Sequence, residues 1–299
     1  PSIWGDSVLL PQAVADSCRE ISFPISHTES RTLSAAAEHS AATKQRRQDG
    51  RTFDQLRPLI CEQRLINRAD GSARISAGEQ FPHAFEMIAQ SKPGFAGQCA
   101  VLVAVHGPRQ SPSPRREDPS ALTIAVTVKP ASGTAGPQEK HLATLLTNAL
   151  NAVVVRSDFP RCVLDVTVQV QSADGGVAGL ALCAAGLACS DAGVPLLGML
   201  EAATVAITPG GDLIVDPTEE EEDVAASVCT AGFCSSAALP GSFGASATNG
   251  VVVSQMSGIL ETESLSQTLL AIRAAAATSG AFFSVSQKQL TARDHGQLQ

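Results

Sequence analysis

The chain has 299 residues, of which 44% are apolar and 17% charged, and its formal net charge is −8. A chain of this length can bury a sizeable core in one large domain or two small ones. The acidic balance argues against a freestanding nucleic-acid clamp, which needs a basic face, although a local basic strip remains compatible with it. Aromatic residues make up 4% of the chain and tyrosine is absent, so few side chains can stack on bases.

The cysteines indicate a reducing compartment. Eight of them are spread through apolar runs, and none has ligand spacing to another cysteine or to any of the six histidines. We therefore expect buried, reduced thiols instead of zinc ligands or a disulfide scaffold. No apolar run is expected to reach the roughly 20 residues of a membrane span, and no charged-then-apolar leader opens the sequence, so we expect a soluble intracellular protein without a membrane partner.

The chain divides into an arm, a domain and a tail. Residues 1–48 show no sustained periodicity and are predicted to form an N-terminal arm or tail of low complexity. A basic targeting signal around Lys44, Arg46 and Arg47 is the alternative for this segment. The remaining predicted parts are a domain, two insertions within it and a C-terminal tail: residues 49–290, residues near 79–98 and 235–249, and residues 291–299.

Strands come first in the predicted domain. "RADGSAR" (residues 68–74) places Asp-Gly between two strand-like runs, which indicates a hairpin. An apolar run follows at Cys99–Val105, and apolar and polar residues then alternate from Leu122 to Val128, as in a half-buried strand. After a Gly/Pro break, apolar residues at i, i+3, i+4 and i+7 predict an amphipathic helix: Leu142, Leu145, Leu146, Ala149, Leu150 and Val153.

The next segment predicts a strand, a tight turn and a buried helix. Leu164–Gln171 alternates with period two, and Ser172–Gly176 is a glycine-rich turn. Val177–Ala192 consists of small apolar residues nearly all round, and a helix without a polar face must be buried. Gly193, with Pro195 just beyond, is a typical helix end.

The last third predicts a hairpin, further strands and a long helix. "ATVAITPGGDLIVDP" is expected to turn around residues 209–212, and the acidic run Glu219–Asp223 to form a solvated loop, with metal binding as the alternative. Strands are predicted at Val224–Phe233 and Val251–Gln255, and a helix from about Thr262 to Phe283. The order predicts an α+β fold of two layers, with mixed sheets packed on helices.

The turn before the buried helix has the form of an anion site. A loop of this kind gathers backbone N–H groups and the positive helix end at one place. Sites that bind phosphate as a substrate add hydroxyl and guanidinium donors directly after the glycines, because backbone groups alone bind it weakly. Here those positions are apolar, so the sequence predicts a degenerate phosphate site formed by Asp174, Gly175, Gly176, Val177 and Ala178. Asp174 is expected to bond nearby backbone N–H groups and so to shape the turn.

Several motifs resemble those of one family. "CVLDVTVQVQSADGGVAGLALCAAGLACSDAGVPL" (residues 162–196) is similar to the strand, turn and helix of the RNase PH superfamily of phosphorolytic exoribonucleases, as are "DGRTFDQLRPL", "RADGSAR", "VAVHGPR" and "FPR". "GPQEKHLATLLTNALNAVV" and "GDLIVDPTEEEE" resemble family members that form the ring of the eukaryotic RNA exosome. The resemblance covers residues 49–290 apart from the insertions, and implies the RNase PH fold, similar to domain 2 of ribosomal protein S5.

The sequence departs from active members of that family at three places. They carry Thr or Ser and then Arg after the glycine pair, where this chain has Val177 and Ala178. They carry paired arginines at the start of the first amphipathic helix, where this chain has only Lys140 nearby, and an Asp in the strand after the hairpin, where residues 224–228 read "VAASV". Losing two charge-assisted hydrogen bonds to phosphate costs on the order of 3–6 kcal/mol, or about 10²- to 10⁴-fold in rate.

The resemblance therefore implies a subunit without catalytic activity, metal or other cofactor. It implies as partners other RNase PH-like exosome subunits, S1/KH cap subunits, RNA in the ring channel and an associated 3′–5′ exoribonuclease, in the nucleus, nucleolus and cytoplasm. Arg74, Arg109 and Lys140 are the expected RNA contacts, and His106 is expected to be structural. The alternatives are an active phosphate-dependent exoribonuclease, a metal-dependent nuclease that uses Asp174 and the acidic run, and an adaptor that recruits a partner through its arm.

Overall fold

The computed structural model describes most of the domain but not the arm. It covers residues 47, 49–78, 98–110, 118–235, 250–260 and 262–297, with the side chains of residue 263 and residues 289–297 left out. The predictions for the arm, for the targeting signal at Lys44 and Arg46, and for nearly all of the two insertions lie outside the described residues.

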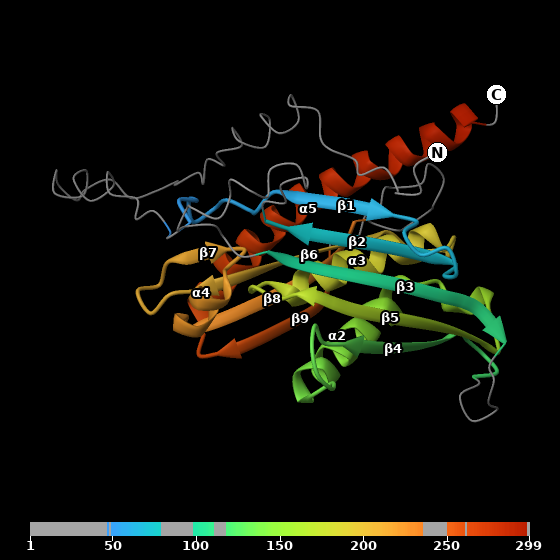
Figure 1. Cartoon of the computed structure of the whole chain (residues 1–299). Helices are drawn as coiled ribbons and strands as arrows, with labels where there is room; N and C mark the ends of the chain where they lie inside the picture. Colours follow the sequence, from blue (N-terminus) through green and yellow to red (C-terminus); the bar gives the residue numbers. More distant parts are fainter. Residues whose placement is uncertain are drawn as a thin grey trace.

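A five-stranded mixed sheet forms one side of the molecule (Figure 1). Its strands are β1 (Leu59–Gln63), β2 (Gly71–Ala77), β3 (Cys99–Gln110), β4 (Thr123–Lys129) and β5 (Cys162–Ser172), in the order β1-β2-β3-β5-β4. The predicted hairpin is confirmed, since β1 and β2 pair antiparallel with Leu59 opposite Ala77. Only β4 and β5 run parallel.

The parallel pair places two helix starts at one end of this sheet. The helix α2 (Pro137–Val153) follows β4, and α3 (Val177–Asp191) follows β5. Because parallel strands end at the same edge, both helices begin there. The predicted apolar face of α2 is confirmed, with five buried residues: Leu145, Leu146, Ala149, Leu150 and Val153.

A second sheet of four antiparallel strands packs on the other side of α3. Its strands are β6 (Met199–Ile207), β7 (Leu213–Val215), β8 (Ser227–Ser235) and β9 (Val251–Gly258), in the order β7-β6-β8-β9. Gly179 and Gly186 of α3 let β6 approach closely, since a Cβ on Gly186 would lie 2.9 Å from the Leu200 side chain. The prediction that α3 is buried is confirmed, because ten of its residues are buried.

The long helix α5 (Thr262–Gln297) covers the other face of the second sheet (Figure 1). Ile272 and Ala276 of α5 share a core cluster with Val205 of β6 and Ala231 of β8. The α+β fold with mixed sheets packed on helices is thus confirmed. Of the seven described cysteines, all are free and only Cys162 is not fully buried.

Several element boundaries differ from the prediction, among them those of α4, β8 and α5. The acidic run forms a short helix, α4 (Glu219–Val224), whose start is capped by Glu221, because the carboxylate of Glu221 accepts the N–H of the N-cap residue Thr218 at 2.9 Å. The strand β8 therefore begins at Ser227, three residues later than predicted. The helix α5 continues past Phe283 to Gln297, since no proline or glycine occurs between Gly280 and Gly296.

One described helix is long and apolar enough to cross a membrane by length and composition alone. It is Ser264–Lys288 of α5, with a hydropathy of 1.4. The expectation that no apolar run reaches this length is therefore wrong for α5. Its serines and threonines interrupt the alanines, but the mean hydropathy of the segment stays high enough for a membrane span. A core helix of a soluble protein passes the same test, and here 39% of the window is buried inside the fold.

Candidate degenerate phosphate site

The glycine loop, residues 172–176, joins β5 to α3 and has the shape of an anion cradle. Gly175 and Gly176 have φ angles of 70° and 63°, and Gly176 is the N-cap of α3. The left-handed backbone suits glycine, which has no Cβ to clash. Space requires it too, because a Cβ on Gly175 would lie 2.3 Å from the carbonyl oxygen of Pro217. The loop is therefore packed directly against the backbone of Pro217–Glu219.

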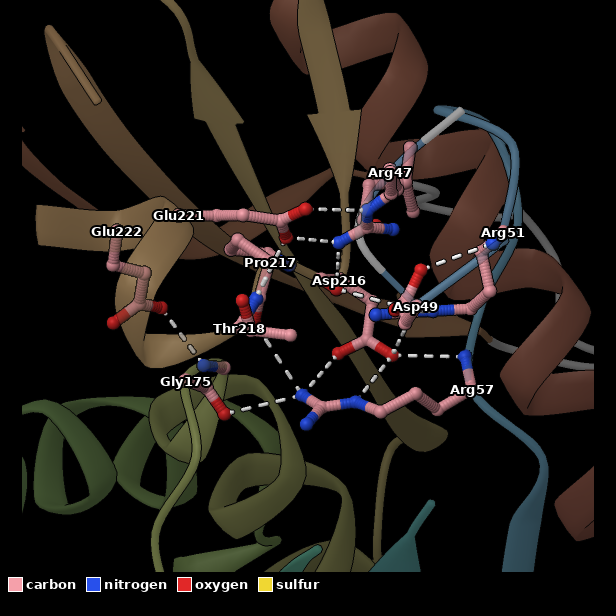
Figure 2. Close-up of polar contacts among 12 residues, drawn as sticks. Arg47, Asp49, Arg51, Arg57, Gly175, Asp216, Pro217, Thr218, Glu221 and Glu222 are labelled. Atoms are coloured by element: carbon pink, nitrogen blue, oxygen red, sulfur yellow. Dashed lines mark hydrogen bonds and ion pairs between the residues drawn. The ribbon is translucent and has the colours of Figure 1, made fainter. Parts of the chain in front are cut away.

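A buried arginine holds the glycine loop through its carbonyl oxygens. Arg57 is 2% exposed, and its guanidinium donates to the carbonyl oxygen of Asp174 at 2.7 Å and to that of Gly175 at 3.3 Å. It also binds both carboxylate oxygens of Asp216, at 2.9 and 2.7 Å. Figure 2 shows this guanidinium lying between the loop and Asp216. Bidentate pairs of this kind are both strong and geometrically specific, so the loop conformation is held by the protein itself.

Two further arginines complete an arginine network around Asp216, consisting of Arg47, Arg51 and Arg57 with their acidic partners. Arg51 lies 3.4 Å from the Asp216 carboxylate and also bonds Asp49. Arg47 donates to the carbonyl oxygens of Val215 and Asp216 and pairs with Glu221 of α4 (Figure 2). The network therefore ties the start of the described chain to β7 and α4.

The electrostatics of Asp216 follow from this network. Burial alone would raise the pKa of Asp216, but its hydrogen bonds and ion pair with Arg57 outweigh burial and hold the pKa below its ordinary value. The same contacts raise the pKa of Arg57 despite its burial. The pair is therefore fully charged at neutral pH.

The anion position at the start of α3 is taken by a side chain of the same protein. The N–H of Gly176 donates to a carboxylate oxygen of Glu222 at 2.8 Å. Burial raises the pKa of Glu222, although this hydrogen bond and the charge of Arg57 oppose the effect. Asp174 lies beside it, with its carboxylate 3.1 Å from Arg57. The carboxyl groups of Glu222 and Asp174 thus both lie at the glycine loop.

The start of α2 is filled in the same way. The N–H of its N-cap, Gly136, donates to the carboxylate of Glu139 at 2.7 Å. Both helix starts at this end of the first sheet therefore bind internal carboxylates. Lys140, one of the predicted RNA contacts, lies in the first turn of α2 and so at the same end as the glycine loop.

Side-chain donors are absent from the two positions after the glycine pair. Val177 and Ala178 are half-buried and pack against the main core cluster. At the matching start of β8, Ser227 is 4% exposed, and its hydroxyl has no hydrogen-bond partner among the described residues. The described residues hold no group of three or more His, Cys, Asp or Glu side chains arranged to bind a metal ion. Positions 177 and 178 thus contribute apolar contacts to the core, and the start of β8 contributes a buried hydroxyl.

The other two predicted RNA contacts lie at different distances from the glycine loop. Arg74 sits near the middle of β2, where it binds Glu62 at 3.1 Å and Gln171, the residue before the glycine loop, at 2.8 Å. Arg109 lies at the end of β3 and pairs with Asp165. Arg74 and Arg109 are thus each paired with a carboxylate, and Arg74 reaches the strand end from which the loop begins.

Asp174 and the acidic run both connect α4 to its surroundings. The Asp174 carboxylate accepts the backbone N–H of Glu219 at 3.5 Å and also binds Arg57, so it links the glycine loop to α4. The acidic run is not a purely solvated face, because Glu221 and Glu222 bind Arg47 and Gly176. His106 lies half-buried on β3, opposite Asp165 of β5.

Sequence reasoning missed Arg57, Asp216 and Glu222 as the residues that build this site. Arg57 and Asp216 are 159 positions apart, so no local periodicity links them. A usable signal was an arginine inside an apolar segment, "DQLRPLI", together with a lone Asp after the strand "LIV", because buried charges require partners.

The chain matches a known protein family and resembles several known proteins. Residues 55–195 match the RNase_PH family, described as the 3′ exoribonuclease family, domain 1. The chain is 32% identical over 185 residues to the exosome complex component Rrp41 of Archaeoglobus fulgidus, covering 59% of this chain and 64% of that protein. It is 31% identical over 176 residues to the exosome complex exonuclease RRP46 homolog of Arabidopsis thaliana, covering 59% and 65%. The match therefore spans less than two thirds of the length of these relatives.

A solved structure extends the similarity. The crystal structure of rice (Oryza sativa) Rrp46 superposes with a TM-score of 0.68 at 26% identity, covering 81% of this chain and all of that one. The superposition includes regions beyond the family match, so the second sheet and its helices belong to the same architecture.

Proposed function

Because the chain belongs to the RNase PH family of 3′ exoribonucleases, we propose that it is a non-catalytic, Rrp46-like subunit of an RNA exosome ring. The observation that carries this proposal is the occupied helix start. The N–H of Gly176 is bound to Glu222, and the next two side chains, Val177 and Ala178, offer no donor to phosphate.

The magnitudes support loss of phosphorolysis. Two missing charge-assisted hydrogen bonds cost on the order of 3–6 kcal/mol, or about 10²- to 10⁴-fold. A carboxylate about 4 Å from a bound phosphate would add about 4 kcal/mol of repulsion at an effective dielectric constant near 20. Glu222 and Asp174 both belong to the site, so the two effects act in the same direction.

On this proposal the work of the chain is architectural. It packs against other RNase PH-like subunits, carries S1/KH cap subunits, and helps to form a channel through which RNA reaches an associated 3′–5′ exoribonuclease in the nucleus, nucleolus and cytoplasm. A net charge of −8 is compatible with this role, because the strip that faces RNA is a small part of the surface. The proposed RNA contacts are Lys140, at the same end of the first sheet as the glycine loop, Arg74, which bonds Gln171 just before that loop, and Arg109 at the end of β3.

Catalysis is tested with the full chain. Purified protein is incubated with single-stranded RNA, inorganic phosphate and magnesium, and nucleoside diphosphates are measured by chromatography. We expect no release above that of a protein-free control. Release that Val177→Asp or Lys140→Ala abolishes would show an active phosphorolytic site and contradict the proposal.

Assembly is tested by mass measurement. A chain that forms a stable complex only with other ring subunits fits the proposed role, whereas a homohexamer would favour the alternative of an active phosphorolytic enzyme. Digestion of RNA by the protein with a metal ion but without phosphate would favour the metal-dependent nuclease. The same protein preparations serve for the mass measurement and for this assay.

A further inference from the structure

One sheet edge differs from the other three in the described part of the chain. Natural sheets protect exposed edges with short strands, charged side chains or covering elements, because an open edge pairs with other strands. The edge β7 has three residues, β1 has five and contains Glu62, and β4 ends at the exposed Lys129. The edge β9 has eight residues, "VVVSQMSG", and carries no charge.

Exposed apolar side chains gather at β9. Val251 and Met256 in the strand are 47% and 43% exposed, and Ile259, just after it, is 88% exposed. Val224, 73% exposed, lies close by, because the N–H of Ile259 bonds the carbonyl oxygen of Ala226. These four make up half of the large exposed apolar residues of the described chain. Such a cluster beside unpaired backbone is typical of an interaction site.

The register shows why this surface stays open. Met256 is paired with Cys229 of β8, so the two side chains point to the same face of the sheet. Cys229 is buried with Ile272 under α5, whereas Met256 is exposed. The helix α5 therefore covers β8 but leaves the same face of β9 exposed at Met256, while Val252 and Val253 of β9 pack against the main core cluster.

We propose that β9 is a docking edge to which an unlike protein chain adds one strand, with apolar side chains at alternate positions and Lys or Arg at the end beside α4. Strand addition supplies backbone hydrogen bonds, and pockets for alternate side chains supply specificity. The charge of the partner follows from α4, whose Glu219, Glu220 and Asp223 are exposed next to the end of β9.

A second copy of this chain fits the edge less well. Each copy carries a net charge of −8, so two copies repel one another, while a partner with a basic end is attracted. Val224 and Ile259 then give the incoming strand apolar contacts close to the acidic helix. The inference rests on the proposed function to the extent that a neighbouring, unlike ring subunit is the expected owner of this strand.

The test uses the full chain co-expressed with the other RNase PH-like ring subunits of the same organism. Met256→Lys places a charge on the docking edge and is expected to weaken assembly about tenfold or more, because the ammonium group must be desolvated. Leu270→Lys is the matched control, since Leu270 is 66% exposed on α5, away from the edge. We expect the control to assemble like the unmodified chain.

A second measurement identifies the occupant. A photo-crosslinking residue at Ser254 is expected to label a strand of an unlike subunit that carries Lys or Arg, and the β9 amides that exchange rapidly in the free chain are expected to become protected in the complex. Labelling of a second copy, or of residues 236–249 of the same chain, would overturn the inference. So would assembly with β9 unprotected and unlabelled, which would leave the proposed function intact. Failure of the unmodified chain to assemble would contradict the proposed function and, with it, the partner named here.

Discussion

The buried arginine at the centre of the network gives a quantitative prediction. Replacing Arg57 by Met keeps most of the side-chain volume but removes the bidentate partner of Asp216 and the donor to the Asp174 carbonyl. The Asp216 carboxylate would then be left buried with Arg51, 3.4 Å away, as its remaining cation. Breaking a buried pair in this way costs about 3–5 kcal/mol, because one charge stays uncompensated.

The loss is measured by urea unfolding and thermal melting at pH 7, followed by circular dichroism. For a domain of about 150–250 residues, 1 kcal/mol corresponds to about 2–4 °C, so we expect the melting temperature to fall by about 6–20 °C. Arg109→Met is the matched control. Arg109 also pairs with a carboxylate, but its side chain is 56% exposed, and exposed pairs contribute about 0–1 kcal/mol.

The double variant Arg57→Met with Asp216→Asn separates two causes. Removing the stranded charge should restore part of the lost stability if uncompensated burial is the main cost. If Arg57→Met and Arg109→Met lower the free energy of unfolding equally, the burial argument is refuted. A cost below about 1 kcal/mol for Arg57→Met would refute it as well.

Two further predictions concern the same region. The pKa of Asp216 in the folded protein lies below its ordinary value of 3.8, so its contribution to the free energy of unfolding is present above that pH and is lost as the pH falls through the folded pKa. Urea unfolding between pH 7 and pH 3 should therefore show stability falling below about pH 4. The fall should be smaller in the Arg57→Met, Asp216→Asn variant. Gly175→Ala should destabilise the protein by more than about 2 kcal/mol, because the new Cβ meets the Pro217 carbonyl at 2.3 Å, whereas Gly133→Ala, with a similar φ of 83° but open space, should cost only about 1 kcal/mol; equal melting temperatures for the two variants would contradict this.

Local sequence patterns correctly predicted the elements whose burial follows from the periodicity of their own apolar residues. The small apolar residues of α3 require a helix enclosed on all sides, and the alternation in β4 and β5 requires half-buried strands. The glycine pair likewise predicted the turn that opens α3. In each case the periodicity and the tertiary environment agree, so residues a few positions apart were sufficient.

The rest depends on contacts between distant residues. The acidic run reads as a solvated loop because consecutive carboxylates repel, yet α4 forms since Arg47, 174 positions away, binds Glu221. The role of Glu222 depends on the position of α4 against α3, which no local period encodes. The sequence shows that β9 carries no charged residue. Its exposure depends on tertiary structure, because α5 packs over β8 and does not extend over β9.

The way Arg57 holds the glycine loop has a consequence for how such a protein changes over time. Its guanidinium grips carbonyl oxygens, which every amino acid possesses, and a carboxylate on another strand. The conformation of the glycine loop is therefore independent of the side chains at positions 177 and 178. Substitutions at those two positions during evolution can therefore change the groups offered to a ligand while the surrounding scaffold keeps its shape.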